Sequence, residues 1–202
     1  MKRFKAIIFD LGGVLSLGPR NNGVHSFVAK KLGMNLDTYF DSIDEVYADA
    51  ITGKISPQKA LKVMARNLNT NPEKLERFYL QSYKKNFKRD NTLYNFALNL
   101  KKKGYKISIL SDIWKAAREA ILTEEKYGKF DDIVTSYEVG VRKTNPRIFR
   151  VALKRLNVKP GEAIFTDNRV WNLIAPRKLG ITAILYKNPQ QFVGDLKKLG
   201  IK

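Results

Sequence analysis

Four short polar clusters in this chain of 202 residues hold the side chains that are best suited to chemistry. The clusters are Asp10-Leu11-Gly12-Gly13, Ser111-Asp112, Lys143 and Asp167-Asn168. An aspartate is ionised at pH 7 and can attack a phosphoryl group or an alkyl carbon, forming a covalent ester. Because such a carboxylate and an anionic substrate repel each other, the site must supply positive charge. A lysine supplies it as a point charge, and a bound Mg²⁺ supplies it more strongly.

The other members of these clusters suit the binding of phosphate oxygens. The Ser111 hydroxyl and backbone N–H groups can hold those oxygens, and Gly12 and Gly13 allow the backbone to come close. Each residue alone has an ordinary structural explanation, as a turn residue, a helix cap or a surface lysine. Their order along the chain and their shared position after predicted strands favour one common site.

Five strands are predicted to position the clusters, and helices alternate with them. The strands cover residues 4–9, 105–110, 132–136, 163–166 and 181–186, and the helices cover residues 93–100, 114–122, 146–156 and 172–179. This alternation indicates βαβ crossovers and a parallel sheet. Ligands of open parallel sheets bind outside the carboxyl ends of the strands. We therefore expect the clusters to converge at that edge of the sheet.

Residues 16–87 interrupt the alternation with helical patterns alone. Apolar residues recur there at steps of three and four, and Ser56-Pro57 and Asn71-Pro72 are typical of helix starts. No strand pattern occurs in this block. We predict an α/β fold in which residues 1–15 and 88–202 form a Rossmann-like core with a parallel sheet. Residues 16–87 are predicted to form an inserted, all-helical cap.

The composition excludes several kinds of site and location. The chain has no cysteine, which rules out disulfides, thiolate metal sites and cysteine nucleophiles. Its apolar runs are far shorter than the about 20 residues that a membrane helix needs. The basic and then apolar N-terminus is typical of a strand that stops at Asp10, not of a signal peptide. We therefore expect a cytoplasmic protein that does not enter a membrane.

The net charge of +19 is distributed unevenly. Residues 16–87 carry 11 basic and 7 acidic side chains, whereas the rest of the chain carries 27 and 12. The excess therefore lies mostly in the part that holds the predicted site, which suits a small anionic substrate. Contacts with nucleic acid stay open, although the dispersed basic residues favour a solvated, lysine-rich surface instead.

Four segments together resemble the motifs of the haloacid dehalogenase-like (HAD) hydrolase superfamily. They are Ile7–Leu15, Ile107–Ser111, Gly140–Phe149 and Ala163–Asn172, and they follow the order of the family. The segment Ile51–Ser56 is similar to the cap of the branch that includes sugar-phosphate phosphatases and the N-terminal phosphatase domain of epoxide hydrolase. The resemblance covers essentially the whole chain and implies an HAD-like core with a helical cap.

The resemblance implies a metal site around the nucleophile. Asp10 would be both the nucleophile and a ligand of Mg²⁺. The backbone carbonyl of Gly12 and the pair Asp167-Asn168 would complete the metal site. The implied function is a Mg²⁺-dependent phosphatase that acts on a small phosphorylated metabolite through an aspartyl-phosphate on Asp10.

The resemblance also implies a phosphate site. Ser111 would bind the transferring group, with Gly12, Gly13 and Asp112 beside it. Lys143 would hold the nucleophile and neutralise charge. The cap would close over the site, exclude water and select the substrate.

Four residues depart from the family pattern. Many phosphatases of the family carry an aspartate at the position of Gly12, where it serves as general acid and base. Asn168 replaces an aspartate that would be the more direct metal ligand, and because an amide brings no charge we expect weaker binding of Mg²⁺. Asp112 stands in place of an asparagine and adds negative charge near the phosphate, and Thr144 stands in place of a proline.

These departures keep two other functions open. The first is a catalytically degenerate family member that binds a ligand, a protein or nucleic acid. The second is a metal-free 2-haloacid dehalogenase, because Trp171 stands where those enzymes carry a tryptophan. Dehalogenases place a carboxylate at the position of Asn172 to activate water, and its absence counts against this alternative.

Overall fold

The computed structural model describes residues 3–17 and 23–201 and has a parallel sheet at its centre. The sheet has five strands in the order β5-β4-β1-β6-β7, and all of its neighbouring strands run parallel. The strands are β1 (Ala6–Phe9), β4 (Lys106–Ser111), β5 (Asp132–Thr135), β6 (Ala163–Asp167) and β7 (Thr182–Leu185). They lie within one or two residues of the predicted ends. The predicted α/β fold is therefore confirmed.

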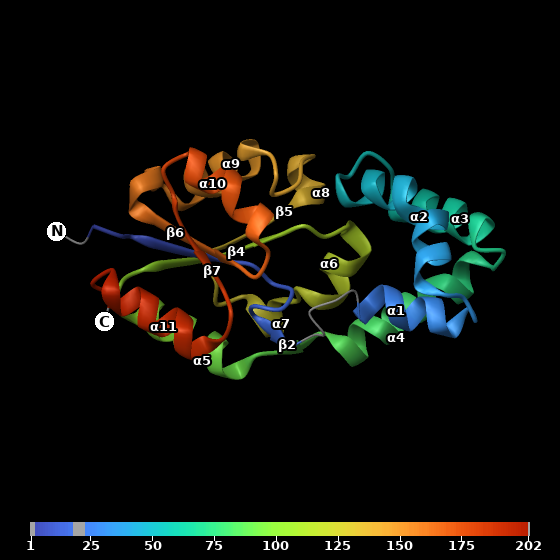
Figure 1. Ribbon diagram of the computed structural model, residues 1–202, viewed down its shortest axis with the longest axis horizontal. Helices are drawn as coiled ribbons and strands as arrows, with labels where there is room; N and C mark the ends of the chain where they lie inside the picture. The colour runs from blue at the N-terminus through green and yellow to red at the C-terminus, as the bar shows by residue number, and fades with distance from the viewer. Residues whose placement is uncertain (1–2, 18–22, 202) are drawn as a thin grey trace.

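Helices cover both faces of this sheet (Figure 1). Ile7 and Phe9 of β1 pack with α5 (Asn91–Lys102) and α11 (Pro189–Lys198) on one face. Ala6 and Ile8 face the other way, toward α9 (Pro146–Leu156) and α10 (Ile174–Lys178). Because both faces are covered, β1 is an unbroken apolar run instead of an alternating one.

Shorter helical segments connect the remaining strands. They are α6 (Lys115–Ile121), α7 (Glu124–Tyr127), α8 (Ser136–Val139), η1 (Pro160–Glu162) and η2 (Val170–Leu173). The helix predicted over residues 172–179 is divided into the 3-10 turn η2 and the helix α10. This division places Pro176 in the first turn of α10, where its missing N–H group breaks no hydrogen bond.

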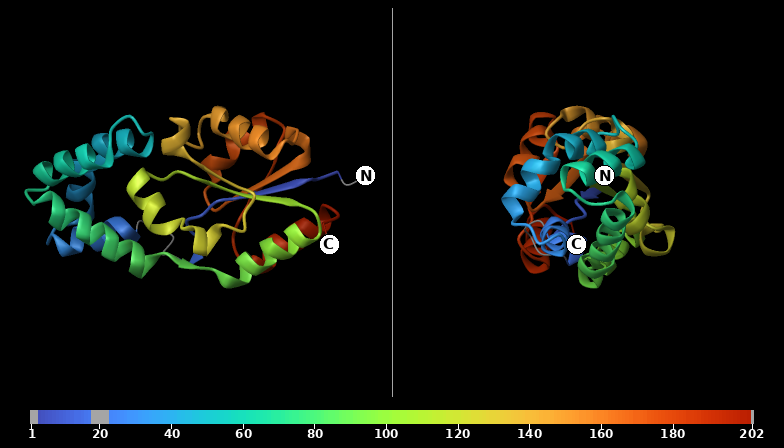
Figure 2. Two further views of the ribbon diagram at one scale, coloured as in Figure 1. Left: turned by 180° about the vertical axis from the view of Figure 1, so that it is seen from behind. Right: turned by 90° about the vertical axis from the view of Figure 1, so that its right-hand side faces the viewer.

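The block between β1 and β4 holds four helices within the described residues: α1 (Gly23–Lys31), α2 (Leu36–Ile51), α3 (Pro57–Asn67) and α4 (Pro72–Asn86). They lie together at the end of the sheet toward which β1 runs (Figures 1 and 2). Asn35, Ser56 and Asn71 cap α2, α3 and α4 by accepting hydrogen bonds from backbone N–H groups of the first turn. The two Pro-containing helix starts predicted from the sequence are therefore confirmed.

A short antiparallel ribbon connects this helical block to the core. It consists of β2 (Ser16–Leu17) and β3 (Lys88–Arg89). The expectation that residues 16–87 contain no strand is wrong at Ser16 and Leu17, because two paired residues leave no periodic pattern. The cap limits at residues 16 and 87 stay a prediction. Among the described residues, no helix is both long and apolar enough to cross a membrane.

Candidate active site

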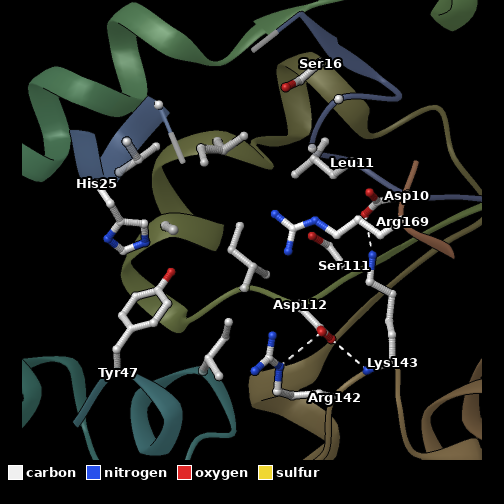
Figure 3. A pocket seen from close by; sticks show the side chains of 18 of the residues that line it. Asp10, Leu11, Ser16, His25, Tyr47, Ser111, Asp112, Arg142, Lys143 and Arg169 are labelled. Carbon is white, nitrogen blue, oxygen red and sulfur yellow. Dashed lines mark hydrogen bonds and ion pairs between the residues drawn. The ribbon is translucent and has the colours of Figure 1, made fainter. Parts of the chain in front are cut away.

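The predicted cluster residues meet at the carboxyl edge of the sheet. Asp10 follows β1, Ser111 ends β4 and Asp167 ends β6, while Lys143 precedes α9. All four side chains are buried. The Lys143 Nζ atom lies 2.6 Å from Asp10 Oδ1 (Figure 3). It also lies 2.6 Å from Asp167 Oδ2. One lysine therefore neutralises part of the charge of two buried carboxylates.

This burial changes the acidity of the three charged groups. Burial raises the pKa of Asp10 to about 6, against the opposing effect of Lys143. Burial alone would lower the pKa of Lys143, but the adjacent carboxylates of Asp10 and Asp167 raise it above its usual value. At pH 7 the lysine is therefore charged, and Asp10 is mostly ionised and can act as a nucleophile.

Asp167 is fixed by its own loop. Its Oδ1 atom accepts a hydrogen bond from the backbone N–H of Arg169 at 2.8 Å. Its Oδ2 atom accepts from the Asn172 side chain at 3.0 Å as well as from Lys143. Asn172 therefore holds Asp167 in place, a role that the sequence analysis did not assign to it. The available signal in the sequence was its place five residues after Asp167, at the end of the segment Ala163–Asn172.

Asp112 holds the loop that carries Lys143. Its Oδ1 atom accepts from the backbone N–H of Lys143 at 2.9 Å, and its Oδ2 atom lies 3.3 Å from Arg142 Nε (Figure 3). Both carboxylate oxygens are thus used within the protein. A direct contact between Asp112 and phosphate stays a prediction. The Ser111 hydroxyl, by contrast, has no hydrogen-bond partner in the described part of the chain.

The two glycines after Asp10 differ in what they require. Gly13 has a φ of +77°, and a Cβ atom there would clash with the side-chain amide of Asn168. A side chain at Gly13 is therefore excluded both by conformation and by space. Gly12 does not have a positive φ, and a Cβ atom there would meet nothing within 4 Å. The position where family phosphatases carry an acid thus has room for one.

A cavity of about 640 Å³ opens above these residues, between the sheet edge and the helical block. Asp10, Ser111 and Lys143 line it from the core, and His25 and Tyr47 line it from α1 and α2 (Figure 3). Burial lowers the pKa of His25 to about 4, so its imidazole is neutral at pH 7. The rest of the helical wall combines apolar and aromatic side chains with the acidic residues Asp44 and Glu45.

Hydrogen bonds connect the helical block to the core beside this cavity. The Trp114 Nε1 atom donates to the Tyr83 hydroxyl at 2.6 Å, and the Ser136 hydroxyl donates to the Ile51 carbonyl at 2.7 Å. Tyr83 and Ile51 belong to α4 and α2, whereas Trp114 and Ser136 follow β4 and β5. The cavity walls are therefore held together by bonds between segments far apart in the sequence.

Comparison with known proteins identifies the family of this chain. Residues 4–180 match the family described as haloacid dehalogenase-like hydrolase. The chain belongs to this family. The hydrolase is 27% identical to glyceraldehyde 3-phosphate phosphatase from Pyrococcus furiosus over 206 residues, which cover 93% of this chain and 82% of that protein. It is also 31% identical to bifunctional epoxide hydrolase 2 from Sus scrofa over 109 residues, covering 51% of this chain and 20% of the much longer relative.

Solved structures show the same fold. A HAD family enzyme from Bacteroides thetaiotaomicron matches with a TM-score of 0.78 at 20% identity, covering 96% of the hydrolase and 99% of that chain. Other structures of that enzyme contain magnesium, or magnesium together with inorganic phosphate. At this identity the likeness establishes the fold of the hydrolase and not its substrate.

The oxygen atoms around Asp10 can hold a magnesium ion, but they carry less negative charge than the family pattern provides. Asn168 Oδ1 is buried and has no hydrogen-bond partner within residues 3–17 and 23–201. A buried carbonyl oxygen without a donor is available to a cation, and Mg²⁺ prefers oxygen ligands. No group of three or more acidic or histidine side chains that could hold a metal occurs in the described ranges. The residues of the hydrolase thus fit Mg²⁺ with fewer carboxylates than the family pattern provides.

Three further cavity residues were not predicted from the sequence. They are Arg142, Arg169 and Tyr47. Each arginine is adjacent in sequence to a predicted site residue, so the strand-end rule could have indicated both. Tyr47 belongs to an aromatic pattern at helical spacing, and the sequence does not show which of those rings faces the site.

Proposed function

We propose that the hydrolase is a Mg²⁺-dependent phosphatase of small phosphomonoesters that works through an aspartyl-phosphate on Asp10. The observation that carries this proposal is the ionised carboxylate of Asp10, which is held by Lys143 and lines the cavity between the sheet edge and the helical block. A carboxylate in that position attacks phosphorus without a general base. The similarity to glyceraldehyde 3-phosphate phosphatase from Pyrococcus furiosus and the family membership support the same class of reaction.

The proposed reaction has two steps. Lys143 binds Asp10 Oδ1, which leaves Oδ2 to form a bond to phosphorus while the bond from phosphorus to the leaving oxygen breaks. Because Gly12 carries no acid, the departing alkoxide takes its proton from water in the cavity and leaves as an alcohol. A water molecule then attacks phosphorus, and the bond from phosphorus to Asp10 Oδ2 breaks. The attacking water gives a proton to solvent, and the products are inorganic phosphate and the free Asp10 carboxylate.

The chain's own residues have distinct parts in these steps. Ser111 is placed to donate its unpartnered hydroxyl to a phosphate oxygen, and Lys143 keeps its positive charge beside the reacting carboxylate. Mg²⁺, held by Asp10, the Gly12 carbonyl and Asn168, would supply further positive charge to the phosphate. Asp167, Asn172 and Asp112 position these groups through the hydrogen bonds described above.

Phosphate release is the direct test of this function. The purified protein should release phosphate from para-nitrophenyl phosphate and from sugar phosphates in the presence of Mg²⁺, and a chelator should suppress the release. If no substrate releases phosphate with Mg²⁺, the phosphatase proposal fails and the binding-protein alternative is favoured. Halide release without metal would favour the dehalogenase alternative, which Asn172 disfavours because its amide is bonded to Asp167.

Replacing Gly12 with aspartate should increase the hydrolysis of substrates with poor leaving groups. The open space at this position accepts the side chain, and a general acid contributes about 10²-fold or more when the leaving alkoxide needs a proton. We expect at least about a tenfold increase in kcat/KM for glycerol 3-phosphate. The increase for para-nitrophenyl phosphate, whose leaving group needs no proton, should be much smaller.

The control for this change is the substitution Gly12→Asn, which has the same shape but cannot transfer a proton. Equal rates for the aspartate and asparagine variants would show that position 12 does not supply the missing acid.

Replacing Asn168 with aspartate should strengthen the binding of Mg²⁺. A carboxylate adds a full negative charge beside the buried Asp10 and Asp167, so we expect affinity to rise by about tenfold or more. Calorimetric titration with MgCl₂ measures this directly. The substitution Asn95→Asp adds the same charge on the exposed surface of α5 and should leave the affinity unchanged. Equal affinities for the parent and Asn168→Asp would remove Asn168 from the metal site.

A further inference from the structure

Arg169 contributes a positive charge to the cavity that no carboxylate neutralises within residues 3–17 and 23–201. It follows Asn168 directly and lines the same cavity as Asp10. No carboxylate forms a salt bridge with it in the described residues, and its guanidinium lies 5.7 Å from the centre of the Trp171 ring. Figure 3 shows its side chain pointing into the cavity, toward the side where Tyr47 and His25 lie.

Arg142 adds a second guanidinium from the opposite side. Its Nε atom pairs with Asp112, while the two terminal nitrogens of the guanidinium are not used in that contact. Its side chain also points toward the side of Tyr47 (Figure 3). Arg142, Arg169 and Asp112 together carry one net positive charge, apart from Lys143 and its two carboxylates.

Tyr47 brings a hydroxyl group to the same place from α2. Its ring packs against His25, with ring centres 4.8 Å apart, and near Trp114. Its hydroxyl has no hydrogen-bond partner among the residues that the structure describes. Burial raises the pKa of Tyr47 to about 12, and the charges of Arg142 and Arg169 act in the opposite direction, which places both guanidinium groups within electrostatic reach.

Asp44 and Glu45 line the cavity from the same helix and carry the opposite charge. Both are exposed to solvent, as Arg142 and Arg169 are, so water and salt screen all four charges. The largest effects of charge on Tyr47 come from Arg142, Asp112 and Arg169, and not from Asp44 or Glu45. Asp112 is the acidic neighbour whose charge acts on Tyr47, and its oxygens are already bonded to Arg142 and Lys143. The side of the cavity between the arginines and Tyr47 therefore favours an anion.

We propose that Arg142, Arg169 and the Tyr47 hydroxyl bind a second anionic group of the substrate. The preferred substrates are then phosphomonoesters that also carry a carboxylate or a second phosphate. The phosphoryl group to be transferred lies at Asp10, and the second anion lies between the core arginines and the cap tyrosine. This inference rests on the proposed phosphatase function, and it assigns the substrate class of that site.

Three compounds that differ at one carbon test the substrate class. Glycerol 3-phosphate ends in a neutral hydroxymethyl group, 3-phosphoglycerate ends in a carboxylate, and glycerol 1,3-bisphosphate ends in a second phosphate. Because a charged hydrogen bond contributes about 1.5–3 kcal/mol, we expect kcat/KM for at least one anionic compound to exceed that for glycerol 3-phosphate by about tenfold or more. The carboxylate and the bisphosphate arms show which anion is preferred.

Variants then assign the effect to named residues. In Arg169→Gln the ratio of kcat/KM between the anionic and the neutral compound should fall toward one, mainly because KM for the anionic compound rises. Arg169→Lys should keep part of the preference for the anionic compound. Tyr47→Phe, which removes the hydroxyl alone, should also lower the ratio. The exposed Arg150 on α9 lies outside the cavity, and Arg150→Gln should keep the parent ratio. Because both compounds are measured with the same variant, this ratio is unaffected by a general loss of activity.

A binding measurement separates this inference from the proposed function. Calorimetry on the Asp10→Asn protein compares the affinities of 3-phosphoglycerate and glycerol 1,3-bisphosphate with that of glycerol 3-phosphate, and needs no turnover. Preferential binding of an anionic compound that Arg169→Gln removes supports the subsite, even if no compound is hydrolysed. Equal affinities for all three, or a preference that Arg169→Gln leaves intact, would overturn the subsite while leaving a hydrolytic function unaffected.

Discussion

Phosphate release should fall by at least about a thousandfold when Asp10 is replaced with asparagine, because an amide oxygen cannot form the covalent ester. The substitution keeps the size and shape of the side chain, so the cavity is preserved. Initial rates with para-nitrophenyl phosphate and Mg²⁺ measure the loss. Acid quenching of the parent enzyme during turnover should trap a phosphoryl group on the peptide that contains Asp10, and the variant should show none.

The same substitution should not weaken the folded state at pH 7. The pKa of Asp10 is raised to about 6 in the folded protein, so ionisation of this carboxyl group opposes folding. The free energy of unfolding therefore loses the contribution of the protonated carboxyl group as the pH rises to about 6 and above. A neutral asparagine removes this cost, and Lys143 keeps its partner Asp167. The urea midpoint of Asp10→Asn should therefore equal or exceed that of the parent at pH 7.

Asp41 provides the matched control for this prediction. It is exposed on α2 and does not line the cavity, so Asp41→Asn should keep full activity. If Asp10→Asn released phosphate at the parent rate, the nucleophile would lie elsewhere and the covalent mechanism would be wrong.

Replacing Lys143 with methionine should destabilise the protein by about 3–5 kcal/mol, because it leaves two buried carboxylates without their counter-charge. Methionine has a similar volume, so packing changes little. Urea denaturation at pH 7 measures the difference in unfolding free energy. The loss of unfolding free energy should become smaller as the pH falls through the range in which Asp10 takes up a proton. Lys143→Met should also abolish activity.

Two comparisons make this prediction specific. Lys154→Met removes an exposed lysine of α9 and should change the unfolding free energy by less than about 1 kcal/mol. The double variant Lys143→Met with Asp10→Asn should recover part of the lost stability, because one unpaired charge is then absent. If Lys143→Met were as stable as Lys154→Met, the buried ion pairs would not contribute to folding.

Much of the core followed from local sequence features. The apolar run at Ala6–Phe9, closed by Asp10, identified the central strand because a strand covered on both faces contains no polar alternation. The Ser56-Pro57 and Asn71-Pro72 pairs identified helix starts because their side chains cap backbone N–H groups within three residues. The convergence at one sheet edge followed from the parallel arrangement of the strands.

Contacts between segments that are far apart in the chain left no recognisable pattern in the sequence. The ribbon of Ser16–Leu17 with Lys88–Arg89 joins segments that are far apart in the chain, and each strand has only two residues. The hydrogen bond from the Lys143 backbone N–H to Asp112 likewise joins residues that are 31 positions apart, and a contact of Asp112 with phosphate stays a prediction. The ribbon and the Asp112 hydrogen bond both depend on residues that are distant in the sequence, so a local sequence pattern could not have indicated either contact.

The sequence by itself determined the parallel α/β core and the set Asp10, Ser111, Lys143 and Asp167, because strand ends and residue types are local properties. Only the tertiary structure decided that one lysine serves both carboxylates, that Gly12 has space for a side chain while Gly13 has none, and that two arginines face Tyr47 across the cavity. The reason is physical: burial and distance depend on the packing of separate segments, and they set the charge, the space and the acidity in which Asp10 reacts.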